Sequence, residues 1–179
     1  MTGRKILFHL HLFKNAGTSI DRILKQNFES RWMAYDETNA GSIICTDQFE
    51  QIIHAHPRIE AFSSHQVVPP LPDTQLFVFP IVFIRHPIER LKSAYLFEWK
   101  KQLGLDTPKG SLSEYVKDKL QNRRRNAIEE FQTMRLSNAG RKNFQNIELQ
   151  SDKELLDRAK DFLDQLPCCL LYTSDAADE

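Results

Sequence analysis

Cysteine, net charge and long apolar runs are all scarce in this chain of 179 residues, and each scarcity excludes a class of protein. The three cysteines include the adjacent pair Cys168 and Cys169, a poor basis for a disulfide framework, which favours a reducing compartment. The 24 basic residues balance 24 acidic ones, so overall charge gives no reason to expect nucleic acid or an anionic membrane as a partner. No segment approaches the roughly 20 apolar residues that span a bilayer. We expect a soluble, cytoplasmic protein.

The two ends of the chain need separate interpretation. The opening "MTGRKILFHLHLF" is basic and then apolar like a signal peptide, but it has two histidines and no small-residue cleavage site, so we interpret it as a strand. Residues 169–179 break the preceding helical pattern and resemble a translated sequencing-library adapter. We predict one domain over residues 1–168, incomplete at its C-terminus, followed by a non-native tail over residues 169–179. A genuine polar tail is the alternative.

Strand and helix patterns alternate along the chain. A period of two predicts a strand over residues 5–12, and residues 61–65 look like a short strand that runs into a loop. The most apolar run, residues 76–84, has the length and the β-branched and aromatic content of a central strand buried on both faces, in which Pro80 requires a bulge or a strand start. Helical spacing or capping signals predict helices from Thr18, from Thr46 as N-cap, after Pro87, from Ser111, over 122–136 and from Ser151. This alternation predicts an α/β fold with three layers, a P-loop-type central parallel sheet flanked by helices. Ligands of such folds bind at the carboxyl ends of the strands.

The first strand-to-helix junction reads "KNAGTS", residues 14–19. The first turn of a helix leaves backbone N–H groups unpaired and attracts anions, and Gly17 allows the backbone to approach a ligand closely. Thr18 and Ser19 add hydroxyl donors, and Lys14 adds a positive charge. We interpret the segment as a phosphate-type cradle. Because the lysine precedes the only glycine, the spacing is not that of a Walker A loop. A plain N-cap beside an exposed lysine is the alternative.

The second junction, "FIRHPIERLKSAY", follows the buried strand over residues 76–84. Arg85 leaves the strand at the same predicted sheet edge, and Ser93 lies about two turns into the next helix. An arginine fork and a serine hydroxyl can bind a second phosphate. Two anion-binding junctions imply a ligand with two separated anionic groups. Alternatively, Arg85 pairs with Glu89 or Glu98, and Ser93 is an ordinary helix residue.

These segments resemble a known family. "HLFKNAGTSI" is similar to the 5′-phosphosulfate loop, and "IRHPIERLKSAY" to the 3′-phosphate motif, of sulfotransferases that use 3′-phosphoadenosine 5′-phosphosulfate (PAPS). The resemblance is closest to carbohydrate sulfotransferases of the heparan sulfate 2-O-sulfotransferase type and their bacterial relatives. "FSSHQ" and "FQTMRL" resemble a histidine segment and a later helix of these enzymes. The loop departs from the usual pattern, with Phe13 in place of proline and Asn15 in place of threonine.

The resemblance implies a role for each matched residue. The cofactor loop comprises Lys14, Asn15, Ala16, Gly17, Thr18 and Ser19, and the 3′-phosphate contacts come from Arg85 and Ser93. Lys14 is expected to stabilise the charge that develops on the leaving oxygen, and His65 to remove the acceptor proton. A histidine that merely hydrogen-bonds a loop corner is the alternative for His65, and Glu98 is a rival base.

Other polar groups receive structural interpretations. We expect His54, His56 and His86 to be structural, and no metal, because His9 and His11 have no cysteine or carboxylate at metal-ligand spacing. The run Arg123 to Arg125 suits either an anionic glycan or a solvated helix face, and Arg135, Arg141 and Lys142 are similarly ambiguous.

The leading hypothesis is therefore a PAPS-dependent sulfotransferase that acts on a hydroxyl of a carbohydrate or glycan acceptor. A P-loop kinase is the second, although the lysine is misplaced for it and no clear magnesium-binding aspartate follows a strand. The third is a nucleotide-binding fragment without catalytic activity.

Overall fold

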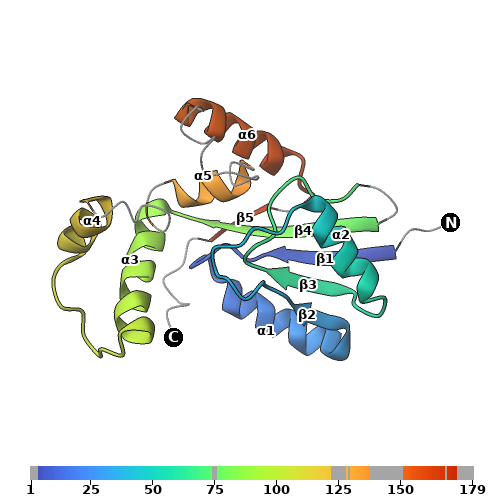
Figure 1. Cartoon of the computed structure of the whole chain (residues 1–179), viewed down its shortest axis with the longest axis horizontal. Helices are drawn as coiled ribbons and strands as arrows, with labels where there is room; N and C mark the ends of the chain where they lie inside the picture. Colours follow the sequence, from blue (N-terminus) through green and yellow to red (C-terminus); the bar gives the residue numbers. More distant parts are fainter. Residues whose placement is uncertain are drawn as a thin grey trace.

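A computed structural model describes residues 4–73, 76–121, 128, 130–137, 151–167 and 169–172. Its strands form one parallel sheet in the order β2-β3-β1-β4-β5 (Figure 1). The strands are β1 (Arg4–Leu10), β2 (Trp32–Ala34), β3 (Ala61–Ser64), β4 (Leu76–Arg85) and β5 (Cys169–Tyr172). The central position of β1 places the loop that follows it between the loops after β3 and β4.

Helices connect and cover these strands. The α-helices are α1 (Gly17–Phe28), α2 (Thr46–Ala55), α3 (Pro87–Phe97), α4 (Leu112–Gln121), α5 (Phe131–Leu136) and α6 (Asp152–Asp164). A 3₁₀ turn, Glu29–Arg31, follows α1, and a π-helical turn, Glu98–Gln102, continues α3. Within the described ranges, no helix combines the length and apolar character needed to cross a membrane.

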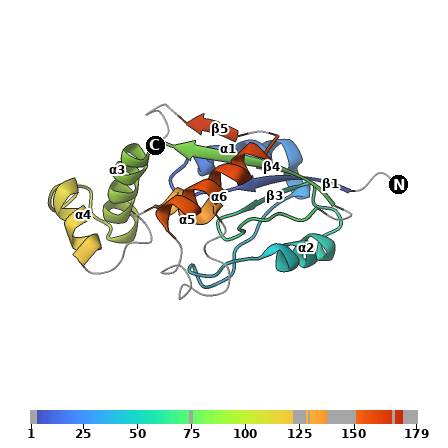
Figure 2. The same cartoon turned by 90° about the horizontal axis from the view of Figure 1, so that it is seen from above.

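Alternate residues of β1 point to different layers of the molecule. Ile6, Phe8 and Leu10 are buried in the main apolar core, to which α2, α5 and α6 also contribute side chains. His9, on the opposite face of the strand, meets Asp21 of α1. Figure 2 shows α1 on one side of the sheet and α2 on the other. The predicted three-layer α/β fold with a parallel central sheet is confirmed.

Capping chemistry explains several helix boundaries. Ser151 accepts a hydrogen bond from the Glu154 backbone at 3.3 Å, and the Glu154 carboxylate accepts one from the Ser151 backbone at 2.8 Å, so the predicted capping box is confirmed. Ser111 and Glu114 form the same reciprocal pair. The prediction for Thr46 is wrong, since Cys45 is the N-cap and the Thr46 hydroxyl donates to the carbonyl of Pro70 instead.

Three other segments differ from the predicted pattern. Pro80 lies inside β4, opposite Phe8 of β1, and no strand starts there. The strand tolerates this proline because β5, as described, pairs with β4 only from Val82 onward, so Pro80 has a neighbouring strand on one side only. The predicted continuous helix over residues 122–136 is wrong at Glu130, whose φ of 47° is left-handed; residues 122–127 and 129 lie outside the described ranges. Cys169–Tyr172, interpreted as tail, forms β5, while the boundary at residue 168 stays a prediction.

Candidate functional site

The carboxyl ends of β1, β3 and β4 bring the predicted site residues to one edge of the sheet. Lys14 lies in the loop after β1, His65 directly follows β3, and Arg85 is the last residue of β4. Both neighbours of β1 run parallel to it, so their ends face the same way. The expectation that the two junctions and the histidine share this edge is confirmed, whereas their chemical roles stay predictions.

The loop between β1 and α1 has an unusual backbone. Lys14 and Ala16 both have left-handed conformations, with φ of 64° and 63°. Left-handed residues of this kind occur in anion-binding nests of backbone N–H groups, but the N–H of Asn15, between them, donates to the Leu12 carbonyl at 3.2 Å. The first donors into α1 are Ser19 and Ile20, both to the Ala16 carbonyl, so the N–H groups of Gly17 and Thr18 precede the helical hydrogen bonds. The N–H groups of Gly17 and Thr18 are therefore the backbone donors with which the predicted cradle would bind an anion.

Gly17 is required by a neighbouring side chain. A Cβ atom at this position would lie 1.9 Å from Cδ2 and Nε2 of His11. The imidazole of His11 thus occupies the space beside the first residue of α1. A glycine is therefore needed here to make room for the His11 ring. This reason is separate from the predicted approach of the backbone to a ligand.

Asn15 holds the centre of the loop in place. Its side chain is buried, with 1% exposure, and its Nδ2 donates to the carbonyl of Phe83 at 2.7 Å and to Oε1 of Gln132 at 2.6 Å. Lys14 and Ala16, on either side of it, have the left-handed conformations, which cost on the order of 1–3 kcal/mol each and persist where surrounding contacts fix them. Asn15 is therefore a structural anchor that connects the loop to β4 and α5.

The two predicted anion-binding junctions contact each other. The Arg85 guanidinium is buried, and its Nη1 lies 3.4 Å from the Lys14 carbonyl oxygen. The Lys14 ammonium lies 4.9 Å from the centre of the Phe97 ring, a cation–π distance that ties the loop to α3. Phe13 packs edge-on against the same ring, with centroids 5.4 Å apart. The departure from proline at position 13 therefore adds an aromatic contact to α3.

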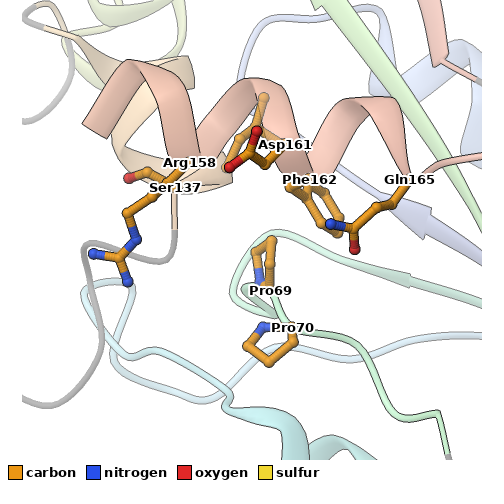
Figure 3. A pocket seen from close by; sticks show the side chains of 8 residues that line it. Pro69, Pro70, Ser137, Arg158, Asp161, Phe162 and Gln165 are labelled. Atoms are coloured by element: carbon orange, nitrogen blue, oxygen red, sulfur yellow. The ribbon is translucent and has the colours of Figure 1, made fainter. Parts of the chain in front are cut away.

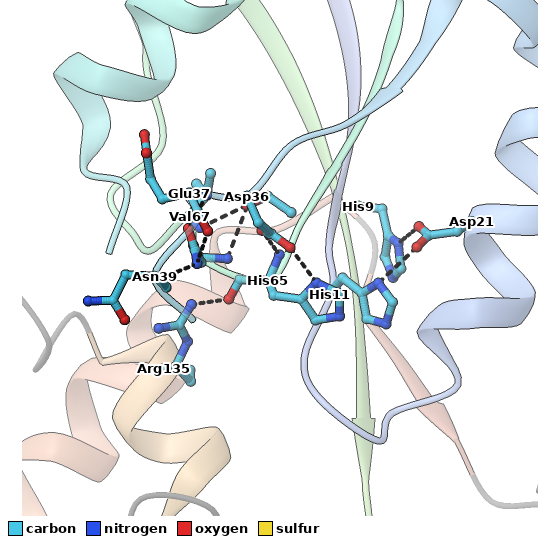
Figure 4. A network of polar contacts seen from close by, with 11 residues as sticks. His9, His11, Asp21, Asp36, Glu37, Asn39, His65, Val67 and Arg135 are labelled. Carbon is cyan, nitrogen blue, oxygen red and sulfur yellow. Dashed lines mark hydrogen bonds and ion pairs between the residues drawn. The ribbon is translucent and has the colours of Figure 1, made fainter. Parts of the chain in front are cut away.

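His65 forms a pair with an aspartate that the sequence analysis did not identify. Its Nδ1 lies 2.7 Å from Oδ2 of Asp36, which follows β2 (Figure 4). Burial alone would raise the pKa of Asp36, but hydrogen bonds from His65 and Ser64 outweigh burial and lower it. Because Asp36 is ionised, Nδ1 of His65 donates to it and leaves Nε2 as the acceptor of the neutral ring. Arg135 of α5 donates to the His65 carbonyl oxygen.

A second histidine–aspartate group lies behind His65. Asp21 of α1 accepts hydrogen bonds from Nδ1 of His9 at 2.8 Å and from Nδ1 of His11 at 2.9 Å. The prediction that these histidines have no carboxylate partner is wrong, because α1 folds back over β1. The three ligand-type atoms lie within 4.8 Å of one another, but each carboxylate oxygen already accepts one imidazole N–H. We interpret the group as a hydrogen-bonded triad.

The charges of this triad follow from burial and from its hydrogen bonds. Burial lowers the pKa of His11; the hydrogen bond to Asp21 opposes this effect, and the nearby His65 reinforces it. For Asp21, burial alone would raise the pKa, but the hydrogen bonds from His11 and His9 lower it well below its ordinary value. At neutral pH, Asp21 is therefore an anion and His11 is neutral.

Glu98, the rival base, is already bound. Lys119 Nζ lies 2.6 Å from its Oε1, and the Tyr115 hydroxyl donates to its Oε2 at 2.8 Å. These contacts stabilise the carboxylate and favour a structural role. Ser93 is buried on α3, and its predicted contact with a ligand stays a prediction.

Two of the three histidines expected to be structural, His54 and His56, have local partners for their side chains, and the third begins a helix. His56 bonds the Ile52 carbonyl at 2.8 Å, His54 lies 3.7 Å from Glu50, and His86 is the N-cap of α3. Arg123 to Arg125, Arg141 and Lys142 lie outside the described ranges.

A separate pocket of about 280 Å³ lies between the loop after β3 and helices α5 and α6 (Figure 3). Its lining mixes prolines and Phe162 with polar side chains: Pro69, Pro70, Leu136, Ser137, Arg158, Asp161, Phe162 and Gln165. It shares no residue with the two junctions or with the His65–Asp36 pair. The chemistry predicted from the sequence therefore does not lie in this pocket.

Sequence reasoning missed two acidic residues. Asp21 lies in the second turn of α1, where nothing in the local pattern indicated its contact with the strand before the helix. Asp36 follows β2, a strand of three residues that is too short to leave a periodic signal. A search for carboxylates near the predicted histidines would have required the order of the strands. Gln132 stood inside the quoted "FQTMRL" segment, but nothing in the sequence indicated its partners.

Comparison with known proteins identifies the family of this chain. An uncharacterized protein of Archaeoglobus fulgidus is 38% identical to this chain over an alignment that covers 59% of the chain and 43% of that protein. The chain thus spans less than half of this relative. The model of the sulfotransferase family matches residues 1–167, which include both junctions, His65 and Asp36. The chain therefore belongs to the sulfotransferase family.

Proposed function

We propose that this protein transfers a sulfuryl group from PAPS to a hydroxyl of a carbohydrate acceptor. The observation that carries the proposal is the contact between the two anion-binding junctions, in which Nη1 of Arg85 lies 3.4 Å from the carbonyl oxygen of Lys14. A helix N-terminus suits one phosphate group, and a buried arginine suits another. PAPS carries two such groups, at the 5′ and 3′ positions of one nucleotide.

On the leaving side of the reaction, Lys14 supplies positive charge. As the bond between sulfur and the bridging oxygen breaks, negative charge collects on that oxygen and on the 5′-phosphate of the departing adenosine 3′,5′-bisphosphate. A lysine and backbone N–H donors fixed in advance stabilise such charge without reorganisation. The contact between the Lys14 ammonium and Phe97 limits the positions that the side chain can occupy.

On the attacking side, His65 takes the proton of the acceptor hydroxyl while the new oxygen–sulfur bond forms. Asp36 fixes the tautomer by accepting Nδ1–H at 2.7 Å, so Nε2 is the basic atom. Asp36 also stabilises the imidazolium that results. The proton acceptor and the charge stabiliser thus lie on different loops of the same sheet edge, and the chemistry requires no metal.

The acceptor class rests on the resemblance of the loop and of the "FSSHQ" segment to carbohydrate sulfotransferases. A kinase is disfavoured by the position of Lys14 before Gly17, because a Walker A lysine follows its second glycine.

A transfer assay tests the proposal. Purified protein is incubated with [³⁵S]PAPS and a panel of glycans in the presence of EDTA, and in parallel with [γ-³²P]ATP and magnesium. We expect ³⁵S on a glycan, no ³²P transfer, and a raised melting temperature with adenosine 3′,5′-bisphosphate. Phosphoryl transfer from ATP would favour the kinase. Nucleotide binding without sulfuryl transfer to any glycan would favour a fragment without catalytic activity.

A further inference from the structure

The side-chain amide of Gln132 joins the two junctions. Its Oε1 accepts hydrogen bonds from the backbone N–H of Arg85 at 2.9 Å and from Nδ2 of Asn15 at 2.6 Å. Its Nε2 donates to the Arg85 carbonyl at 2.9 Å. One side chain of α5 therefore binds both backbone polar groups of the last residue of β4 and, at the same time, the centre of the loop after β1.

The orientations of both amides are determined by their partners. The Phe83 carbonyl and Gln132 Oε1 can only accept, so the atom of Asn15 that faces them must be Nδ2. The Arg85 N–H can only donate, so Oε1 of Gln132 must face it. Reversing either amide would oppose two acceptors or two donors. The arrangement is thus a single network in which each group has one possible assignment.

This network occupies a place where rigidity matters for the ligand. Asn15 lies between Lys14 and Ala16, whose left-handed conformations shape the predicted cradle. Gln132 binds the backbone of Arg85, the residue whose guanidinium is expected to bind the second phosphate. Asn15 is also the position at which the chain departs from the threonine usual in the resembled loop. Asn15 uses both N–H donors of its amide, to the Phe83 carbonyl and to Gln132, whereas a threonine hydroxyl has a single donor and could keep at most one of these two bonds.

We propose that Gln132 is a positioning residue that, with Asn15, sets the separation between the 5′-side cradle and Arg85, and thereby selects ligands that carry two phosphate groups. The inference rests on the proposed function. A fixed separation reduces the ordering cost of binding both groups together, and it matters little to a ligand that reaches only one junction. Loss of the network should therefore weaken the binding of a bisphosphate more than that of either monophosphate.

Calorimetric affinities for adenosine 3′,5′-bisphosphate, 5′-AMP and 3′-AMP test this inference. Gln132→Met keeps the length of the side chain and removes all three hydrogen bonds. Gln51→Met, at an exposed position of α2, is the matched control. We expect Gln132→Met to weaken the bisphosphate by about tenfold or more, each monophosphate by less than about threefold, and the control to change nothing.

The second variant, Asn15→Ala, separates positioning from a general loss of structure. It removes the bonds from Asn15 to Gln132 and to the Phe83 carbonyl and leaves both bonds between Gln132 and Arg85, so a smaller loss of the same selectivity is expected. Equal weakening of all three nucleotides in folded variants, or unchanged selectivity, would overturn the positioning role while the proposed function stands. Failure of the wild-type protein to bind the bisphosphate would overturn the proposed function and this inference together.

Discussion

The imidazole of His65 stacks on that of His11, with ring centroids 3.8 Å apart and planes inclined by 29°. Among the described residues, His65 contacts Asp36 at Nδ1, Arg135 at its carbonyl oxygen and the His11 ring. Burial lowers the pKa of His11, so its ring is neutral when His65 accepts a proton. The neutral His11 ring therefore stacks against His65, and the Asp36 carboxylate can stabilise a positive charge on it.

If His65 is the base, His65→Ala should lower kcat by roughly 10²–10⁴-fold, while the dissociation constant for adenosine 3′,5′-bisphosphate stays near that of the wild type. The measurements are kcat and the calorimetric affinity of both proteins. A variant that loses nucleotide affinity would indicate the corner-histidine role, and a kcat near that of the wild type would assign the base to another residue.

Asp36→Asn removes the charge that supports His65 and leaves a side chain of the same size. We expect kcat to fall by at least tenfold and nucleotide affinity to stay unchanged, because the amide can no longer stabilise an imidazolium. Glu37→Gln, one residue along, is the matched control and should retain full turnover. Equal rates for the two variants would assign Asp36 a structural role.

Lys14→Ala should lower turnover more than it weakens binding of the nucleotide product. The charge on the bridging oxygen is largest in the transition state, and losing one such stabiliser costs on the order of 10²–10³-fold in rate. We expect a smaller loss, below about tenfold, in affinity for adenosine 3′,5′-bisphosphate. Lys25→Ala, on the exposed side of α1, serves as the control. Similar losses in kcat and affinity would make Lys14 an anchor of the ground state.

The sequence predicted most of the elements that position this site, and for a physical reason. Strand or helix periodicity marked β1, α1 and α3, and a continuous apolar run marked β4; the parallel arrangement then required their junctions to meet at one edge. Contacts between distant segments produce no periodic pattern in the sequence. Asn15 and Gln132 are 117 positions apart in the chain, and His65 and Asp36 are 29 positions apart. Such pairs depend on strand order and loop conformation, which local patterns do not encode.

Gly17→Ala should damage the fold even without a ligand, because the new Cβ would lie 1.9 Å from the His11 ring. Displacing a packed ring typically costs about 1–3 kcal/mol, or roughly 3–10 °C in Tm for a domain of this size. Gly41→Ala, where the nearest atom is Oδ1 of Asn39 at 3.4 Å, should change Tm little. In a His11→Ala background, Gly17→Ala should be tolerated, since the ring is gone. Additive losses in the double variant would contradict the clash.

The Asp21 triad should make folding sensitive to acid. Hydrogen bonds from His11 and His9 lower the pKa of Asp21 in the folded protein, so below about pH 4 the unfolded chain binds a proton that the folded protein does not. The lowered pKa of His11 acts in the same direction at higher pH, because an unfolded histidine takes up a proton below about pH 6.5. The free energy of unfolding should therefore fall as the pH drops from 7 to 3.

Asp21→Asn tests the acidic part of this dependence by urea denaturation at a series of pH values. At pH 7 the variant should be less stable by about 2 kcal/mol, because the charge-assisted hydrogen bonds from the two imidazoles are weakened. Its stability should also change less between pH 4 and pH 3, because the carboxyl group that titrates there is gone. Asp47→Asn, near the start of α2 and exposed, should keep the wild-type profile. An Asp21→Asn profile parallel to that of the wild type would show that other carboxyl groups cause the acid sensitivity, since removal of the group with the lowered pKa must flatten the curve.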